Sequence, residues 1–410
     1  MKILIHGINY TPELTGIGKY TGEMGAWLAK NDHAVDVIAA MPYYPEWSKK
    51  EGYKGKWWFK ESIAGASVYR CPLYVPKKVT GATRMIHEFS FLASSGFFWI
   101  RFLFKRYDIV FTPYPPLIIG FCPWLYKIFH PKATWVFHVQ DLQVDAAREL
   151  KLIQNKTLLT ILENIEHFWL RKCDYVSSIS TGMRDRILSK GIHASKYIML
   201  PNWAETNIIK PLPTSESMRT ELGIPLDSKV LLYSGNLGEK QGVEMLIDAA
   251  NQLKSKTNIL FVIAGEGASK QKLIEYAASK QLENILFLPL QSYAKLASFL
   301  AIADIHLVIQ KKSAADLVLP SKFMSILSAG GVSLVTAEPN TSLYDMVATN
   351  NLAYICEPEN TSVFVQTIQS ILAEDSTPIA LRARQFAEEK LSIDGILGAF
   401  MQQCSYVQHR

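Results

Sequence analysis

Short apolar runs recur along the chain at intervals that leave room for helices. In the first half, four runs rich in Val, Ile and Phe stand out: residues 2–8, 34–40, 108–113 and 134–139. The pattern restarts in the second half with residues 229–235, 258–265, 284–290, 304–310 and 332–338. Apolar strands that alternate with helical intervals are typical of parallel sheets covered by helices. The pattern therefore predicts an α/β protein with two doubly wound, Rossmann-like domains.

The length of the chain agrees with two domains. Single hydrophobic cores stop growing at roughly 250 to 300 residues, and this chain has 410. Residues 200–217 hold three prolines and little periodicity, which predicts an interdomain connection with a boundary near residue 205. We therefore expect domains at 1–205 and 206–385. The stretch 380–407 is predicted to be helical except around 392–395, and 386–410 forms a terminal helical segment that can pack back on the first domain.

Composition indicates an ordinary folded protein with an uneven distribution of charge. Lys and Arg exceed Asp and Glu by nine in residues 1–205, whereas Asp and Glu exceed them by three in the rest. A basic half suits an anionic membrane surface or a phosphorylated substrate as well as a nucleic acid, and a solubilising surface explains it equally well. No further feature favours nucleic acid. The five scattered cysteines argue against a disulfide framework or a zinc site, so we expect a reducing, cytoplasmic location without a signal peptide.

The longest apolar stretch is residues 89–104. It is too short for a membrane span and contains Arg101. Two interpretations remain: a buried helix of the N-terminal domain, which we favour for its apolar face, or an aromatic and cationic helix in a membrane interface. The second interpretation draws on the basic flanks Arg84, Lys105 and Arg106.

Candidate site residues follow the predicted strands, because ligands of open α/β sheets bind outside the carboxyl ends of the strands. Gly16 and Gly18 follow the first strand and precede a helix, where they let a phosphate or sugar approach the backbone. The spacing of Gly16, Gly18 and Gly22 is not the dinucleotide fingerprint, and no acidic residue closes the second strand. We therefore expect no nicotinamide cofactor.

A histidine and two aspartates stand at the end of the strand at 134–139. His138 and Asp141 are the catalytic candidates, with Asp145 close behind, although a satisfied core histidine is the alternative for His138. No Asp-x-Asp pair occurs in the chain, so a divalent ion bridging a diphosphate has no evident holder. We expect no metal and no other cofactor. Lys, Arg and helix N-termini would instead stabilise the negative charge of a leaving diphosphate.

In the second domain, three turns that follow predicted strands contain further candidates. The first has the composition of a diphosphate cradle, with two glycines and a lysine before a helix, but an ordinary glycine-rich turn with an exposed lysine remains the alternative. The second lets a base or ribose lie against the backbone, and the third places a lysine in the first turn of a helix. The residues are Gly235, Asn236, Gly238 and Lys240 in the first turn, Gly265, Glu266 and Gly267 in the second, and Pro320, Ser321 and Lys322 in the third.

These features resemble the retaining nucleotide-sugar glycosyltransferases of family 4, whose GT-B fold has two Rossmann-like domains facing across a cleft. The likeness covers nearly the whole chain. It is strongest to the glycosyltransferases of colanic acid biosynthesis. The matching segments are GINYTPELTGIGKYTGEM, MPYYPEW, CPLYVPK, LPNWAE, LYSGNLGEKQG, LPLQSY and AADLVLPSKFMSILSAGG.

The resemblance implies a role for each candidate. Gly16 and Gly18 would face the donor or acceptor sugar, and His138 would lie beside the reacting carbon. In the second domain, Lys240 would face the donor diphosphate. The remaining contacts would be those of Glu266 and Gly267 with the base, and of Ser321 and Lys322 with the ribose and phosphates.

The chain departs from the family pattern at four positions. The usual Glu-x7-Glu pair falls on Leu317 and Ser325, with Asp316 adjacent to the first. Asn236 stands where the family has Arg, and Gln241 where it has Lys.

The resemblance implies an activity, partners and a location. The activity is sugar transfer with retention from a nucleotide-sugar, GDP-fucose, to a lipid-diphosphate-linked saccharide, with the protein peripheral on the inner face of the cytoplasmic membrane. The basic first half suits such an acceptor at an anionic surface. A sugar-nucleotide epimerase of the same architecture is an alternative, but acidic residues are scarce after the N-terminal strands. A degenerate, non-catalytic partner protein is the other alternative, which the departures at Leu317 and Ser325 keep open.

Overall fold

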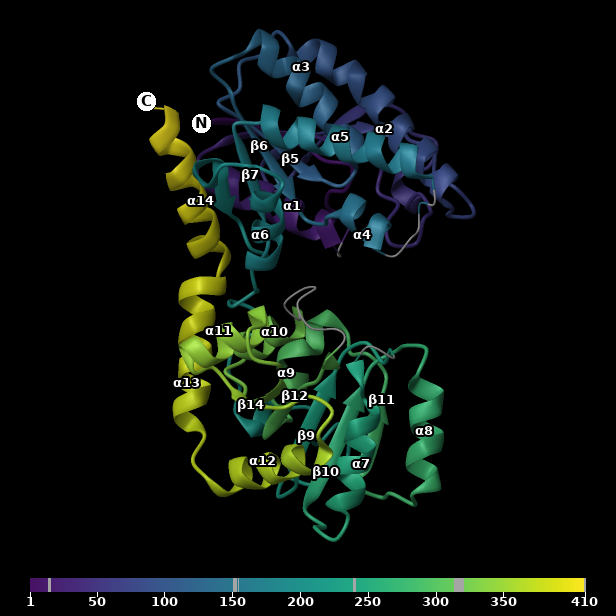
Figure 1. The fold of residues 1–410 in the computed structure, drawn as a ribbon, viewed down its shortest axis with the longest axis vertical. Helices are drawn as coiled ribbons and strands as arrows, with labels where there is room; N and C mark the ends of the chain where they lie inside the picture. Colours follow the sequence, from purple (N-terminus) through teal and green to yellow (C-terminus); the bar gives the residue numbers. More distant parts are fainter. Residues whose placement is uncertain (14–15, 150–152, 154, 239–240, 313–320, 409–410) are drawn as a thin grey trace. The chain divides into compact units, whose positions relative to one another are not determined.

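The chain divides into two compact units, each built on one sheet (Figure 1). The computed structural model describes all residues except 14–15, 150–152, 154, 239–240, 313–320 and 409–410. Unit 1 comprises Met1–Asn202 together with Leu397–Arg410, and unit 2 comprises Trp203–Ile396.

The sheet of unit 1 has eight strands in the order β3-β4-β2-β1-β5-β6-β7-β8. All neighbours are parallel except β3 and β4. The order reverses between β1 and β5, which creates a topological switch point at the carboxyl ends of these strands. The strands are β1 (Lys2–His6), β2 (Ala34–Ala40), β3 (Phe59–Ile63), β4 (Ala66–Cys71), β5 (Ile109–Tyr114), β6 (Thr134–Val139), β7 (Tyr175–Ser178) and β8 (Tyr197–Met199).

Helices of unit 1 begin where side chains can satisfy their free backbone N–H groups. Thr80 caps α2 in a reciprocal capping box with Thr83, and Asn155 and Ser180 cap α5 and α6. No helix in the described part of the chain is long and apolar enough to cross a membrane. The helices are α1 (Gly16–Lys30), α2 (Gly81–Phe102), α3 (Phe121–Phe129), α4 (Gln143–Glu149), α5 (Lys156–Lys172), α6 (Thr181–Ser189) and, from Leu397 onward, α14 (Ile393–Gln408).

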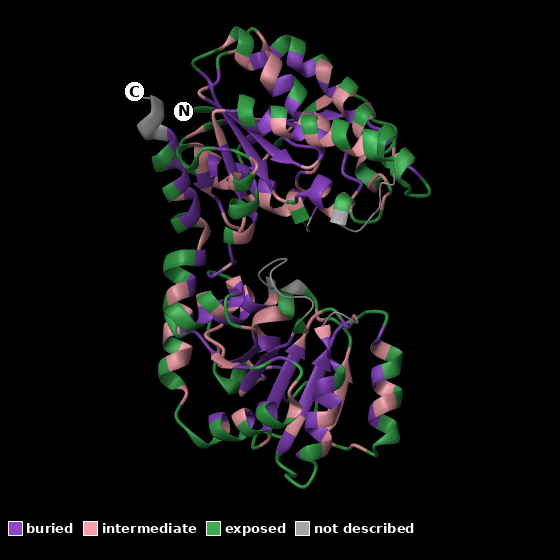
Figure 2. Cartoon of the chain, viewed as in Figure 1, coloured by how far each residue is buried: buried purple, intermediate pink, exposed green. Residues whose placement is uncertain are grey.

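Unit 2 contains a parallel sheet of six strands in the order β11-β10-β9-β12-β13-β14. Along β9 (Lys229–Ser234), Val230 and Leu232 pack into one apolar core while Leu231 and Tyr233 pack into another. Both faces of this strand are therefore covered, and the strands of both sheets are largely buried in Figure 2. The other strands are β10 (Ile259–Ala264), β11 (Ile285–Leu288), β12 (Ile305–Val308), β13 (Ser333–Thr336) and β14 (Tyr354–Cys356).

The described helices of unit 2 follow its strands and continue into the terminal stretch. They are α7 (Glu244–Gln252), α8 (Lys270–Ser279), α9 (Leu296–Leu300), α10 (Ser321–Ser328), α11 (Ser342–Asn350), α12 (Thr361–Ala373) and α13 (Thr377–Phe386). A π-helical turn over Ala387–Leu391 separates α13 from α14. Ala383, Ala387 and Leu391 pack into the core of unit 2, whereas the chain from Leu397 onward belongs to unit 1.

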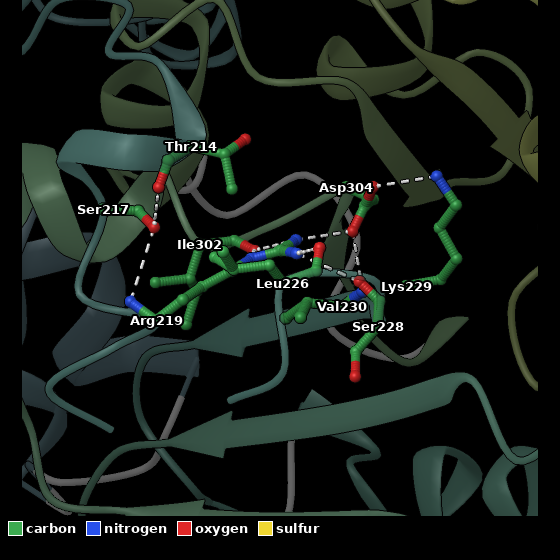
Figure 3. A network of polar contacts seen from close by, with 9 residues as sticks. All are labelled: Thr214, Ser217, Arg219, Leu226, Ser228, Lys229, Val230, Ile302 and Asp304. Carbon is green, nitrogen blue, oxygen red and sulfur yellow. Dashed lines mark hydrogen bonds and ion pairs between the residues drawn. The ribbon is translucent and has the colours of Figure 1, made fainter. Parts of the chain in front are cut away.

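A buried arginine stabilises the amino ends of two central strands of the unit 2 sheet, β9 and β12, at the end opposite the glycine-containing loops (Figure 3). Arg219 is 4% exposed, and its guanidinium donates to the carbonyls of Leu226, Ser228 and Ile302 and to Asp304 Oδ2 at 2.6–3.0 Å. Asp304 in turn accepts from the backbone N–H of Val230 at 2.8 Å. The network thereby joins the segment before β9 to the start of β12 (Ile305–Val308).

The prediction of two doubly wound α/β domains is confirmed. Five strands were not singled out in the sequence: β3, β4, β7, β8 and β14. These are short or lie near the ends of the sheets, and β3 alternates between half-buried and exposed positions. Such strands lack the continuous apolar run by which buried parallel strands are recognised.

Candidate functional site

The loop after β1 contains a buried carboxylate that the sequence analysis missed. Glu13 is 2% exposed, and its Oε1 accepts hydrogen bonds from the backbone N–H groups of Tyr43 and Tyr44, both at 2.9 Å. Asn9 Nδ2 donates to its Oε2 at 2.8 Å. Burial raises the pKa of Glu13, and these hydrogen bonds oppose the rise. Glu13 thus joins the loop after β1 to the loop after β2.

The glycines of α1 let this loop pack closely against the helix. Gly16 has φ +59°, in the left-handed region that favours glycine. A Cβ on Gly18 would lie 2.8 Å from Glu13 Oε2, and one on Gly22 would lie 2.7 Å from Thr11 Cβ. Gly18 and Gly22 therefore make room for the protein's own loop. The predicted contact of Gly16 and Gly18 with a sugar stays a prediction.

A second buried arginine, Arg70, donates a hydrogen bond to the same loop. Arg70 is fully buried on β4 and donates to the carbonyls of Ala40 and Thr11 and to Glu61 Oε1. Lys50 Nζ donates to the Pro12 carbonyl at 3.1 Å. The carbonyls of the loop are thereby satisfied from outside, which fixes its path at the carboxyl end of β1.

His138 lies near the end of β6, and both of its ring nitrogens have hydrogen-bond partners. Gln140 Nε2 donates to its Nε2 at 2.9 Å, which leaves the proton on Nδ1 to be donated to Ser177 Oγ, also at 2.9 Å. The same Gln140 amide donates to Asn202 Oδ1 at 3.1 Å. Burial lowers the pKa of His138 to about 3. In this state His138 is a neutral ring, and its Nε2 is free to meet a ligand only if Gln140 moves.

Asp141 and Asp145 differ in their surroundings. Asp141 is exposed, and desolvation by the surrounding protein raises its pKa while Arg84 opposes the rise. Asp145 is buried and its Oδ2 lies 2.7 Å from Lys190 Nζ, which also pairs with the buried Glu166. Asp145 therefore anchors α4 to α5 and α6, and of the two aspartates only Asp141 is accessible for chemistry.

In unit 2, the loops after β9 and β10 interlock through their backbones. Leu237 N–H donates to the Glu266 carbonyl at 2.9 Å. A Cβ on Gly265 would lie 1.9 Å from the Gly235 carbonyl oxygen, and one on Gly267, whose φ is +157°, would lie 2.5 Å from the Leu237 oxygen. Gly265 and Gly267 are thus required by the approach of two main chains, which brings the predicted phosphate and base turns together.

Lys322 in the first turn of α10 lies beside these loops. Its Nζ lies 3.9 Å from the centroid of the Tyr233 ring and 3.7 Å from the position of a Cβ on Gly235. The ammonium contacts no carboxylate among the residues that the structure describes. Burial lowers the pKa of Lys322 to about 7. A cation without a carboxylate partner in the described part of the chain is suited to an anionic ligand.

The remaining candidates occupy varied positions. Glu266 is exposed and pairs with Lys270 at 2.7 Å, and the Asn236 carbonyl accepts from the Tyr233 hydroxyl at 2.7 Å. Ser325 lies half-buried on α10, which begins at Ser321. Lys240, Asp316, Leu317 and Pro320 lie outside the described residues.

No group of three His, Cys, Asp or Glu side chains that could hold a metal ion occurs within the described ranges. The Lys322 ammonium lies beside Gly235, at the N-terminal end of α10. Backbone N–H groups at a helix start and a nearby ammonium can both stabilise a phosphate.

Two units of this topology form the GT-B fold, and solved structures share it. The sucrose-phosphate synthase of Thermosynechococcus elongatus superimposes with a TM-score of 0.70 at 15% identity, covering 99% of each chain. HepE of Anabaena in complex with UDP also gives 0.70, at 14% identity, covering 99% of this chain and 100% of that one.

Sequence comparisons give the family. Residues 15–203 match the glycosyl transferase 4-like domain, and residues 214–390 match the glycosyl transferases group 1. The chain is 39% identical over 415 residues to the putative colanic acid biosynthesis glycosyl transferase WcaI of Escherichia coli K12, covering 98% of this chain and 99% of the relative. The chain therefore belongs to the group 1 glycosyl transferases with a 4-like N-terminal domain. It is a glycosyltransferase, as its resemblance predicted.

Proposed function

We propose that this enzyme transfers fucose from GDP-fucose to a lipid-diphosphate-linked saccharide, with retention, in the assembly of a colanic-acid-type exopolysaccharide. The name of the E. coli relative, at 39% identity over nearly the full chain, supports the pathway. A nucleotide ligand is supported by the Anabaena HepE structures, which contain UDP and UDP-glucose. The choice of GDP-fucose and of the lipid-linked acceptor rests on the resemblance of the sequence.

The observation that carries the donor site is the Lys322 ammonium at the start of α10, which pairs with no carboxylate of the residues that the structure describes. As the bond to the anomeric carbon breaks, negative charge accumulates on the departing diphosphate. The Lys322 ammonium and the N–H groups at the start of α10 would stabilise that charge, with Gly235, which lies beside Lys322, allowing the phosphates to approach the backbone. Catalysis in this proposal rests on positioning and charge stabilisation by the protein.

The acceptor would bind unit 1 at the carboxyl ends of β1 and β6. There the loop anchored by Glu13 and Arg70 gives a fixed wall, and Asp141 offers an exposed carboxylate with a raised pKa. His138 would act as a neutral, hydrogen-bonding neighbour of the sugar rather than as a nucleophile, because burial keeps its ring uncharged.

The decisive experiment incubates the purified protein with a panel of nucleotide-sugars and lipid-diphosphate saccharides and measures released nucleoside diphosphate. We expect release of GDP from GDP-fucose that requires the acceptor, and an anomeric configuration in the product equal to that of the donor. Lys322→Met should abolish most turnover. Lys295→Met, which removes an exposed lysine paired with Glu221, is the matched control and should not. Turnover with another donor only, or with inversion, would refute the proposed specificity.

We also propose that the enzyme works at the inner face of the cytoplasmic membrane, where a lipid-linked acceptor resides. The basic character of residues 1–205 supports this location.

A further inference from the structure

Helix α2 is apolar on two opposite faces. One face packs into the core of unit 1 through Phe91, Phe98, Trp99 and Phe102. The sequence analysis favoured a buried helix, and this face agrees with that interpretation. The other face also carries apolar side chains, and it is exposed. This exposed stripe consists of Ala82, Ile86, Phe89, Ala93, Phe97, Ile100 and, just beyond the helix, Phe104.

The stripe is continuous along the helix. Its members are three or four residues apart, so they lie above one another on one side of α2. Their exposure is large: Phe97 is 60%, Ile100 67% and Phe104 88% exposed. The 22 residues of α2 span about 33 Å at about 1.5 Å per residue. An exposed apolar surface of this length marks an interaction site rather than scattered surface residues.

Two tryptophans from a different segment widen the stripe. Trp58 Nε1 donates to the Ser94 carbonyl of α2 at 2.8 Å, and its ring lies 5.4 Å from that of Phe97. Trp57 lies 5.9 Å from Trp58 and is 69% exposed. The segment before β3 is therefore attached to α2, and it presents two indole rings, which favour the boundary between water and hydrocarbon.

The first half of the stripe borders a shallow depression that is open to solvent. A pocket of about 610 Å³ is lined by Ala82, Met85, Ile86, Phe89 and Ser90, and four of these five side chains carry no polar group. Such a hollow can receive a hydrocarbon chain.

Basic side chains lie around the stripe, and they divide into those that form an ion pair with a carboxylate and those that do not. Arg84 and Lys105 form ion pairs with Glu88 and Asp36, so their charges are already compensated. Within the described ranges, no carboxylate pairs with Arg101 or Arg106, or with Lys56 and Lys60, which stand on either side of Trp57 and Trp58 in the sequence. Of the four basic residues that the sequence singled out, Arg101 and Arg106 are thus available to an external anion, and Lys56 and Lys60 join them.

We propose that the α2 stripe, together with Trp57 and Trp58, inserts into the interface of an anionic lipid bilayer. This inference rests on the peripheral location proposed above and assigns it to particular side chains. Insertion would bury the apolar rings at the level of the headgroups while the unpaired cations meet lipid phosphates. A second copy of the chain fits less well, because a two-fold contact would bring the same unpaired cations of both copies together.

Sedimentation of the full chain with vesicles tests the proposal. We expect binding to vesicles of phosphatidylglycerol and phosphatidylcholine, weaker binding to phosphatidylcholine alone, and partial release by high salt. Replacing Arg101 and Arg106 by Ser should weaken binding to the anionic vesicles about 30-fold at low salt, at about 1 kcal/mol per basic residue. The apolar variant Trp57→Ser, Phe97→Ser, Ile100→Ser should weaken it at least tenfold at both salt concentrations.

Three exposed leucines of unit 2 provide the matched control. Leu226, Leu290 and Leu381 are 61–68% exposed, and their joint replacement by Ser removes a comparable amount of exposed apolar surface elsewhere. This control should bind vesicles as the wild type does. Equal loss in the control, or wild-type protein that stays in the supernatant at low salt, would overturn the proposal. So would a stable dimer that the apolar variant dissociates in the absence of any vesicle binding.

The donor site gives an independent check. Because the substitutions in the α2 stripe, at Trp57 and at Arg101 and Arg106 lie in unit 1 and far in sequence from Lys322, these variants should bind nucleoside diphosphate like the wild type. Normal nucleotide binding with absent vesicle binding would therefore refute the membrane surface while leaving the proposed transfer intact.

Discussion

Binding of a nucleoside diphosphate to this enzyme should become weaker as the pH rises above 7, and Lys322 should be the cause. Burial holds the pKa of the free lysine at about 7, so at higher pH the unliganded protein carries a neutral amine at this position. A diphosphate placed against the amine favours the charged form. Binding above pH 7 must therefore take up a proton, and the affinity depends on the proton concentration.

The size of the effect follows from the shift. If the complex restores the ordinary pKa of 10.5, the dissociation constant rises about tenfold for each pH unit above 7, or about 1.4 kcal/mol per unit. Between pH 7.5 and 9.0 the affinity should fall roughly 20- to 30-fold. The terminal phosphate of the ligand does not contribute, because its last proton is lost near pH 6.

The same shift predicts the opposite trend for the stability of the free protein. The unfolded chain holds the Lys322 proton up to about pH 10.5, while the folded chain releases it near 7. Between these values the unfolded state binds more protons, so the free energy of unfolding should rise with pH. Ligand binding and stability thus move in opposite directions across one pH window.

Titration calorimetry at pH 7.5, 8.25 and 9.0, in two buffers of different ionisation enthalpy, measures both affinity and proton uptake. Wild type should take up nearly one proton at pH 9.0. Lys322→Met should bind weakly with no pH dependence, and Lys322→Arg should keep a cation that does not titrate. A wild-type affinity that is constant from pH 7.5 to 9.0, or an equal slope in Lys322→Met, would refute this reasoning.

Three further predictions concern the rest of the molecule. Arg219→Met leaves buried carbonyls without donors and should lower the unfolding free energy of unit 2 by about 3–5 kcal/mol, or roughly 6–20 °C in a calorimetric scan, whereas Lys295→Met should change it by less than about 1 kcal/mol. Gly265→Ala should weaken nucleoside diphosphate binding measurably, because its Cβ would displace the Gly235 carbonyl, while Gly96→Ala, which meets open space, should not. EDTA should leave turnover intact, because the described residues offer no metal cluster and Lys322 is a cation at the proposed phosphate site; loss of activity restored by manganese would contradict this expectation.

The fold could be predicted from the sequence to the extent that strands are apolar on both faces. β1, β5 and β9 show this pattern and were predicted. A continuous apolar run can be recognised in the sequence without knowing which strands pair with it. β8 has three residues and β3 is half exposed, and their pairing depends on neighbours that local sequence does not reveal.

Glycines mark close approach but do not say what approaches. Gly18 and Gly265 were interpreted as room for a ligand, and both make room for another part of the chain. Glu13 and Arg70 were missed for a related reason. Their partners Tyr43 and Thr11 lie 30 and 59 residues away, and no motif spacing reports such a contact. Lys322 could be proposed as a candidate because Pro320 and Ser321 mark a helix start, which is a local signal in the sequence.

The terminal helix α14 has a consequence for biosynthesis. Phe400 packs 5.9 Å from Phe111 of β5, and Leu397, Met401 and Cys404 are also buried, although they are translated some 290 residues later than β5. During translation, the surface of unit 1 that α14 covers therefore stays exposed until residue 404 has been synthesised. The order of synthesis thus produces an intermediate whose exposed apolar surface is accessible to chaperones. A fragment ending at residue 202 would inherit that patch permanently, so separating the two units requires α14 to be supplied with the first.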